Sequence, residues 1–173
     1  MGFDLVSTGG TADTLRLAGL KVKDVSELTG VPAMMGGRVK TLDYHIHAGI
    51  LADRDNPEHM ADAAKYGIEM IDLVVVNLYD FLGTAEDPDV SLPELTESID
   101  IGGHTLVRAA AKNWKHVGVV VNLQDYDRIS EELVQRGGWL SSGTKLSLAI
   151  EALDAVACYD RSIPDVLRDR AGY

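Results

Sequence analysis

The sequence has a single cysteine and no long apolar run, and both shortages narrow the class of protein. Cys158 alone cannot form a disulfide within the chain, which fits a reducing compartment, and its apolar surroundings predict a small buried side chain. No apolar stretch approaches the roughly 18 residues that a membrane-spanning helix needs. The first residues, Met1 to Asp4, lack the basic start and apolar run of a secretory signal. We therefore expect a cytoplasmic protein with no membrane partner.

Positive charge is also scarce in this chain. Lys and Arg number 16 against 27 Asp and Glu, which gives a net charge of −11. Such a chain repels the phosphates of nucleic acids and anionic lipids unless its few cations gather in one place. We expect no nucleic-acid partner, and any close pair of cations becomes informative. Hydrophobic residues make up 46% of the 173 residues, enough for one domain with its own core.

Strand-like and helix-like segments alternate along the chain. Short apolar runs predict strands at residues 3–6, 22–25, 71–78 and 117–121. Helices are predicted at residues 12–18, 57–66, 92–98, 106–112, 125–136 and 145–162, the last one interrupted near its end by Pro164. The run Leu73–Val76 is mostly β-branched, which is typical of a strand buried on both faces of a parallel sheet. This order predicts an α/β layered sheet in a single domain.

A glycine-rich turn follows the first predicted strand. In Ser7-Thr8-Gly9-Gly10-Thr11 the glycines let the backbone approach an anion, and hydroxyl and free N–H groups at the start of a helix can surround it. The turn contains neither a Walker motif nor a dinucleotide-binding fingerprint. It indicates a phosphate site, and the alternative is an ordinary tight turn.

Two of the scarce cations stand two residues apart, in Arg38-Val39-Lys40-Thr41. In an extended segment their side chains share one face. Arginine offers a planar fork to phosphate or carboxylate, and lysine offers a point charge. The pair therefore indicates an anion site, and the alternative is a solvated loop.

Polar residues also follow the best predicted strand and precede a predicted helix. Asn77 and Tyr79 lie at the carboxyl end of the strand, where open parallel sheets bind ligands, although they could equally cap and pack. Asp100 could accept a proton or orient an amine, and the N–H groups of Gly102 and Gly103 could stabilise an oxyanion. The alternative for this second segment is an N-cap aspartate with loop glycines.

The histidines do not indicate a metal site. His45 and His47 share a face of what we interpret as an extended segment, but no third ligand stands at a useful spacing. His59, His104 and His116 are isolated in the sequence, so we expect them at the surface or in satisfied positions. We therefore predict no metal.

Six segments, taken together and in this order, closely resemble one family. They are residues 7–12 (STGGTA), 25–30 (VSELTG), 36–42 (GGRVKTL), 76–79 (VNLY), 99–103 (IDIGG) and 107–113 (VRAAAKN). The series is similar to the N-terminal domain of the bifunctional AICAR transformylase/IMP cyclohydrolase over about residues 3–163. Related methylglyoxal-synthase-like domains share the fold but not this series of motifs.

The resemblance implies a fold, a reaction and an assembly. The fold is a methylglyoxal-synthase-like three-layer α/β sandwich with a mostly parallel sheet, covering residues 1–173 with residues 143–173 as a C-terminal helical extension. The reaction is that of a hydrolase-class enzyme, IMP cyclohydrolase, which closes the ring of the formylated aminoimidazole carboxamide ribotide (FAICAR) to IMP with loss of water. No cofactor is implied, the purine ribotide is the ligand, and the family forms homodimers.

The resemblance also assigns roles to positions of this sequence. Four residues match catalytic positions, with Lys112 as the proton-transfer group: Lys40, Tyr79, Asp100 and Lys112. The nucleotide-binding positions are Thr8, Gly9, Gly10, Thr11, Arg38, Val39, Thr41, Val76, Asn77, Ile101 and Gly102. In this arrangement the glycine turn holds the phosphate, while Lys40 and N–H groups near Gly102 stabilise an oxyanion. Asp100 and Asn77 orient the carboxamide.

Three departures from the family pattern lead to a second hypothesis. The family's first βα unit, which helps to hold the phosphate, is missing, and so is the transformylase domain. In Thr41-Leu42-Asp43-Tyr44-His45 the family usually has His-Pro after Thr-Leu, so the loop beside Lys40 is expected to be looser and to carry an extra negative charge at Asp43. The alternative function is thus a catalytically weakened purine-ribotide-binding module of the same fold. A methylglyoxal-synthase-like lyase is disfavoured because that family's carboxylate and histidine pattern is not found.

The concentration of cations generates a first prediction. Replacing either cation, as in Arg38→Ala or Lys40→Ala, should weaken the binding of IMP, because each removes one of the few positive charges that can face a phosphate. Isothermal calorimetry with IMP measures the affinity. Unchanged affinity in both variants would put the ribotide pocket elsewhere in the chain.

Overall fold

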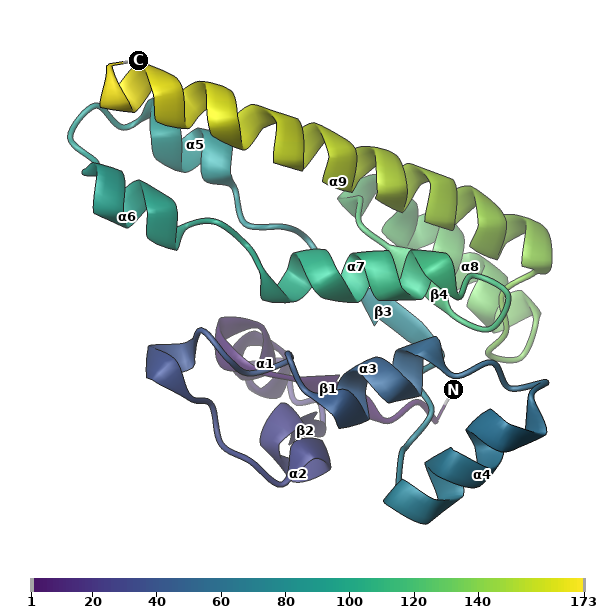
Figure 1. Cartoon of the computed structure of the whole chain (residues 1–173). Coiled ribbons are helices and arrows are strands. Elements are labelled where there is room, and N and C mark those ends of the chain that lie inside the picture. The colour runs from purple at the N-terminus through teal and green to yellow at the C-terminus, as the bar shows by residue number, and fades with distance from the viewer. Residues whose placement is uncertain (1, 173) are drawn as a thin grey trace.

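The computed structural model describes residues 2–172, in which short strands alternate with helices (Figure 1). The N-terminal elements are β1 (Leu5–Ser7), α1 (Gly9–Leu17), β2 (Val22–Asp24), α2 (Val25–Thr29), the 3-10 turn η1 (Met35–Gly37), α3 (Tyr44–Leu51) and α4 (Pro57–Tyr66). The remaining elements are β3 (Leu73–Val75), α5 (Phe81–Glu86), α6 (Leu92–Glu97), α7 (Gly102–Lys112), β4 (Gly118–Val120), η2 (Leu123–Asp125), α8 (Tyr126–Gln135) and α9 (Ser142–Ala171). None of these helices is long and apolar enough to cross a membrane.

The strands pair in parallel, as the sequence predicts. β1 pairs with β2 in the register Leu5↔Val22, and β3 pairs with β4 in the register Leu73↔Gly118. Each connection between partners carries at least one helix, as parallel strands require. The prediction of a parallel α/β fold is therefore confirmed. Among the described residues the strands form two two-stranded sheets and not one continuous ladder.

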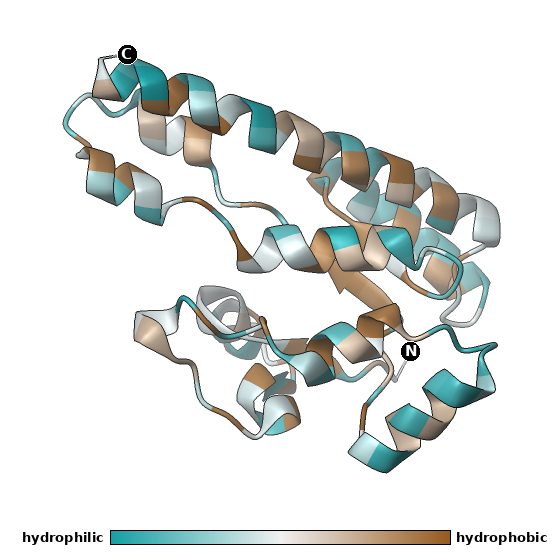
Figure 2. Ribbon diagram, viewed as in Figure 1, coloured by the Kyte–Doolittle hydropathy of each residue, from teal (hydrophilic) through white to brown (hydrophobic). Residues whose placement is uncertain are grey.

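The main core lies where α7, α9, β3 and β4 meet. β4 is buried along its whole length, and α7 contributes Val107 and the small side chains of Ala109–Ala111. α9 faces this layer with Leu148, Ala149, Ala152 and Val156. In Figure 1 the long α9 runs along one side of the molecule above α7, while α1, α2, β1 and β2 gather on the opposite side. Figure 2 shows the hydrophobic residues concentrated at β3 and in bands along α9.

Three local predictions were wrong, each for a physical reason. The segment His45–His47 is helical and not extended, because Asp43 caps α3 by accepting a hydrogen bond from the amide of His45 at 2.8 Å. The strand at 71–78 is reduced to Leu73–Val75, and Val75 is half exposed, so this strand is not buried on both faces. Cys158 is exposed on α9.

The last helix is also longer than predicted, since α9 continues through Pro164 to Ala171. A proline inside a helix removes one backbone hydrogen bond, so contacts beyond it must hold the last turns. Arg170 supplies them by donating to the carbonyl oxygens of Ala85 and Asp87, both at 2.6 Å. Long-range contacts therefore outweigh the local helix-breaking tendency.

Glu132 on α8 holds the start of α9. Its carboxylate accepts hydrogen bonds from the Ser141 amide and the Thr144 hydroxyl, both at 2.7 Å. Burial alone would raise the pKa of Glu132, but these hydrogen bonds outweigh burial and lower the pKa below its ordinary value of 4.5. A carboxylate with a lowered pKa stabilises the fold above its unfolded pKa, and this stability is lost as the pH falls through the folded pKa.

We predict that Glu132→Gln lowers the free energy of unfolding by about 1–2 kcal/mol at pH 7, and that the difference from the unchanged chain shrinks progressively as the pH falls below 4.5, the ordinary pKa of the carboxyl group. Thermal unfolding followed by circular dichroism at neutral pH and in this acidic range measures this. The matched control is Glu131→Gln, an exposed neighbour on the same helix. A deficit that persists undiminished at acidic pH would contradict the assignment to the carboxylate charge.

Candidate functional site

The glycine turn lies between the end of β1 and the first turn of α1. Thr8 is the extended N-cap residue, and α1 begins at Gly9, whose φ of 59° favours glycine. The first N–H groups of a helix have no partner within the helix, and no side chain caps this one. Gly9, Gly10 and Thr11 are exposed, so these donors are accessible to an anion.

Lys40 lies beside this turn, whereas Arg38 does not. A Cβ built on Gly9 would lie 3.7 Å from Lys40 Nζ. Arg38 instead donates to Glu97 on α6 through both Nε, at 3.1 Å, and a terminal nitrogen. The segment is also not a regular extended strand, since Arg38 has helical φ and ψ angles and Val39 makes an isolated bridge with Met34. The two cations thus have different partners, contrary to the expectation that they share a face.

Asp100 is buried at the start of α7, with 8% of its surface exposed. Its Oδ1 accepts a hydrogen bond from the Gly103 amide at 2.7 Å, and its own amide donates to the hydroxyl oxygen of Tyr159 at 2.7 Å. A Cβ built on Gly102 would lie 2.9 Å from Thr41 Oγ1. The capping interpretation of Asp100 is therefore partly correct, and the loop of Lys40 and Thr41 directly contacts this helix start.

The residues after β3 behave in different ways. Val76 packs against the start of α7, where a Cβ built on Gly103 would lie 2.9 Å from Val76 Cγ1. Asn77 uses both ends of its amide, donating to the Val121 carbonyl at 3.0 Å and accepting from the Tyr126 hydroxyl at 2.9 Å. Tyr79 is 64% exposed. Asn77 thus mainly links β3 to the segments after β4. This favours the alternative interpretation of Asn77, in which its side chain caps the backbone and does not contact a ligand.

Lys112 is a predicted catalytic residue that lies at the opposite end of α7 from Asp100. It is exposed and forms the last residue of the 11-residue α7, while Asp100 precedes the first. At 1.5 Å per residue, α7 separates their backbones by about 16 Å or more. The structure therefore brings together Thr8–Thr11, Lys40, Thr41, Val76, Asp100 and Ile101–Gly102, but not Lys112, and it turns Arg38 toward Glu97.

The charges near Lys40 support its place in this group. The pKa of Asp24 is lowered, chiefly by hydrogen bonds from Ser26, with smaller contributions from the positive charges of Arg16 and Lys40. Lys40 therefore acts electrostatically on the end of β2 as well as on the glycine turn.

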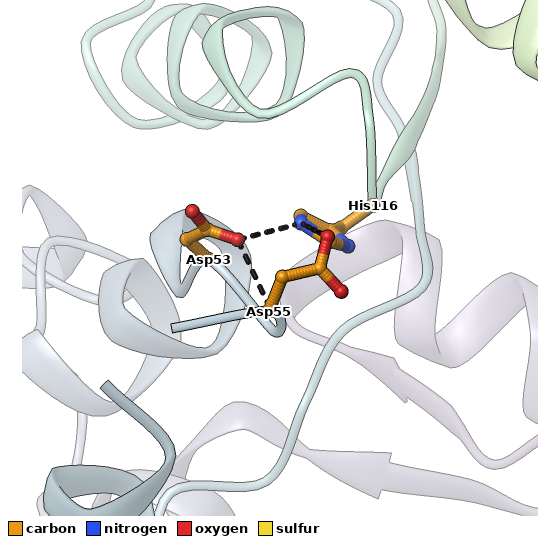
Figure 3. Close-up of side chains that lie close together, drawn as sticks. All are labelled: Asp53, Asp55 and His116. Atoms are coloured by element: carbon orange, nitrogen blue, oxygen red, sulfur yellow. Dashed lines mark hydrogen bonds and ion pairs between the residues drawn. The ribbon is translucent and has the colours of Figure 1, made fainter. Parts of the chain in front are cut away.

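A second cluster was missed by the sequence analysis (Figure 3). Asp53, Asp55 and His116 face one another, with His116 Nε2 3.0 Å from Asp53 Oδ1, so His116 is in a satisfied position as expected, although its partners were not predicted. Their oxygen and nitrogen atoms are metal-ligand types, but Lys115 Nζ already lies 2.5 Å from Asp55. The pKa of Asp53 is lowered, first by the amide of Asp55 and then by His116. The cluster links the loop after α3 to the loop after α7. Its residues are far apart in the sequence, so no spacing pattern could have indicated it.

Comparisons with known proteins identify the family and the fold. Residues 1–105 match the family model of the MGS-like domain, and residues 110–172 match that of the AICARFT/IMPCHase bienzyme. The crystal structure of ForH superposes with a TM-score of 0.78 at 36% identity, covering 95% of this chain and 85% of that chain. The fold and the glycine-turn site thus define an MGS-like domain.

Two curated relatives make the assignment more specific. The bifunctional purine biosynthesis protein PurH of Neisseria meningitidis is 47% identical over 167 residues, which are 96% of this chain and 32% of the relative. PurH of Bacillus cytotoxicus is 46% identical over 171 residues, 99% of this chain and 33% of the relative. The chain belongs to the MGS-like domain family, and its residues 110–172 match the AICARFT/IMPCHase bienzyme model, so the resemblance found in the sequence is confirmed. It spans about a third of the length of these relatives.

Gly103 is the position where the site tolerates least change. A Cβ at Gly103 would lie 2.5 Å from Asp100 Oδ2 and 2.9 Å from Val76 Cγ1, and the Asp100 side chain is buried. We predict that Gly103→Ala displaces the carboxylate and lowers the free energy of unfolding by about 1–3 kcal/mol. Urea denaturation measures the change.

The matched control for this prediction is Gly143→Ala, at the start of α9. There the nearest atom to the new Cβ would be Ser141 Oγ at 3.9 Å, and φ is not positive. This variant should be as stable as the unchanged chain or slightly more stable, because alanine favours a helix over glycine. Equal stability of Gly103→Ala and Gly143→Ala would show that Asp100 does not pack against Gly103.

Proposed function

We propose that this chain is an IMP cyclohydrolase, which closes the ring of FAICAR to IMP with loss of water. The observation that carries the proposal is the convergence of the glycine turn, Lys40 and the buried Asp100 around the starts of α1 and α7. Its family membership and its similarity to bifunctional purine biosynthesis proteins support the same reaction.

The ribotide phosphate is proposed to bind at the start of α1. The free N–H groups of Gly9 and Gly10 point a partial positive charge at this position, and the hydroxyls of Thr8 and Thr11 add donors. The Lys40 ammonium lies beside this turn on the adjacent loop, and we assign it to the oxyanion that develops at the formyl carbon. Arg38 contributes only after it leaves Glu97, so Lys40 is the stronger phosphate or oxyanion partner of the two.

The chemistry proposed at the start of α7 is an addition followed by a dehydration. The carboxamide nitrogen of the substrate attacks the formyl carbon and loses one N–H proton, while the formyl oxygen gains negative charge and then takes up a proton to become the hydroxyl of a carbinolamine. This hydroxyl later leaves with the proton of the former formamide nitrogen. Lys40 and the Gly102 amide stabilise that oxygen. Asp100 keeps Oδ2 for the carboxamide N–H, because Gly103 occupies Oδ1. Loss of the hydroxyl as water then yields IMP.

Much of the proposed rate enhancement comes from conformation and not from strong acid–base catalysis. Both reacting groups belong to one substrate, so the site needs to hold the formyl and carboxamide groups in contact, and well-oriented intramolecular reactions gain greatly from this. Asn77 and Tyr79 border the same end of β3 and are proposed to line the pocket. The proton-transfer role of Lys112 rests on the resemblance alone.

A homodimer in the cytoplasm is part of the same proposal. Three exposed apolar side chains recur at helical spacing on α9, namely Leu146, Ile150 and Leu153. Such a stripe on a surface helix is typical of an interface. This stripe supports the association of two copies of the chain, and so does the resemblance to a family that forms homodimers.

The second candidate is a ribotide-binding module with weakened catalysis. The ion pair of Arg38 with Glu97 favours it, because this cation is withdrawn from the ligand. The concern raised by Asp43 is reduced, since its carboxylate is hydrogen bonded to the amide and to the imidazole of His45, the latter at 3.0 Å, and so caps α3. We therefore keep the enzyme as the main proposal.

We predict that Lys40→Gln and Asp100→Asn each lower kcat for IMP formation from FAICAR by about 10²-fold, as the loss of an electrostatic partner of a developing charge does in other enzymes. The absorbance of IMP follows the reaction. Lys65→Gln and Asp62→Asn, two exposed residues of α4, are the matched controls and should retain full activity. Binding of IMP without any turnover in the unchanged chain would favour the binding module.

A further inference from the structure

Tyr159, on the far helix α9, contacts the backbone that carries Asp100. Its hydroxyl oxygen accepts the Asp100 amide at 2.7 Å, across 59 positions of sequence. The ring of Phe81 on α5 packs edge-on against the Tyr159 ring, with centroids 6.4 Å apart. Phe81 is buried, so the ring of Tyr159 is held by packing while its oxygen is used by Asp100.

A second contact between α7 and α9 lies at the next residue. Asp160 pairs with His104 on α7, with His104 Nε2 2.9 Å from Asp160 Oδ1. Tyr159 and Asp160 therefore both contact the start of α7. Tyr159 contacts the backbone amide of Asp100, and Asp160 contacts the side chain of His104. Of these two, only Tyr159 contacts Asp100 itself.

The phenol of Tyr159 remains neutral in this position. Burial raises its pKa above the ordinary value of 10.0. The hydrogen bond from the Asp100 amide offsets part of this rise, and the nearby carboxylates of Asp100 and Asp160 add to it. A neutral phenol can accept the Asp100 amide through its oxygen without placing a second negative charge beside the carboxylate. Removal of the oxygen would leave the amide of a buried residue without this partner, which favours a shifted backbone.

We propose that Tyr159 is a positioning residue for the cyclohydrolase site, which fixes the buried Asp100 carboxylate against Gly103 through the hydrogen bond that it accepts from the Asp100 amide. This inference rests on the proposed function and extends it to a residue that does not touch the substrate. Tyr159 acts through Asp100, so its loss affects the orientation of the reacting carboxamide and not the phosphate subsite at Gly9 and Gly10.

The test is Tyr159→Phe, which removes one oxygen and keeps the ring. We expect kcat for IMP formation to fall about two- to tenfold, while KM for FAICAR and the affinity for IMP change less than about twofold. Tyr66→Phe, on the exposed α4, is the matched control and should leave all three unchanged. Phe81→Leu removes ring packing but keeps the phenol, so it should lower the melting temperature more than it lowers kcat.

A double-mutant cycle separates positioning from general destabilisation. In the Asp100→Asn background, Tyr159→Phe should cost much less in kcat than it does alone, because the group that it positions is already lost. Amide hydrogen exchange of Asp100 should also be faster in Tyr159→Phe than in Tyr66→Phe, whatever the activity. All assays are run well below the lowest melting temperature of the set.

The outcomes separate this inference from the proposed function. If the unchanged chain forms no IMP, the proposed function and this role fail together. If the unchanged chain is active but Tyr159→Phe has full kcat, or loses kcat additively with Asp100→Asn, only the role of Tyr159 fails. A loss expressed mainly in KM would equally overturn it, because that would assign Tyr159 to binding.

Discussion

The packing of α7 against β4 and α9 is the constraint on which the rest of the structure depends. Val107 and Ala110 are fully buried, and the neighbouring alanines let the two helices and the strand approach closely. Because this packing fixes the position of α7, it also fixes the backbone at both ends of the helix. Asp100 is anchored at one end and Lys112 is exposed at the other, which explains why only the first belongs to the candidate site.

The candidate site is built from close approaches between elements that are distant in the sequence. Gly9 meets Lys40, Gly102 meets Thr41, and Gly103 meets Val76 and Asp100. At each of these three glycines the missing side chain leaves room for a polar or charged group, namely Lys40, Thr41 or Asp100, beside the backbone of a helix start. A buried carboxylate is stable only if its hydrogen bonds replace those of water, and the amide of Gly103 meets that need for Asp100.

The sequence analysis was most successful where a signal is local. The glycine turn before α1 and the proline-started α4 follow from residue types that act on their own neighbours, and the parallel pairing follows from the order of strands and helices along the chain. It was wrong at His45, where one capping aspartate turned an expected extended segment into a helix, and at Pro164, where Arg170 holds the helix beyond the proline. Capping and long-range contacts each outweigh the pattern of the surrounding residues.

The sequence by itself determined the family, the α/β class and the identity of the residues that can carry the chemistry, because motifs and periodicity are properties of the chain alone. The tertiary structure decided which of these residues act together. It pairs Arg38 with Glu97 and His116 with Asp53, and it places the Tyr159 hydroxyl in hydrogen-bond contact with the Asp100 amide. Such pairings depend on how whole helices pack against one another, and packing joins residues that no spacing in the sequence relates.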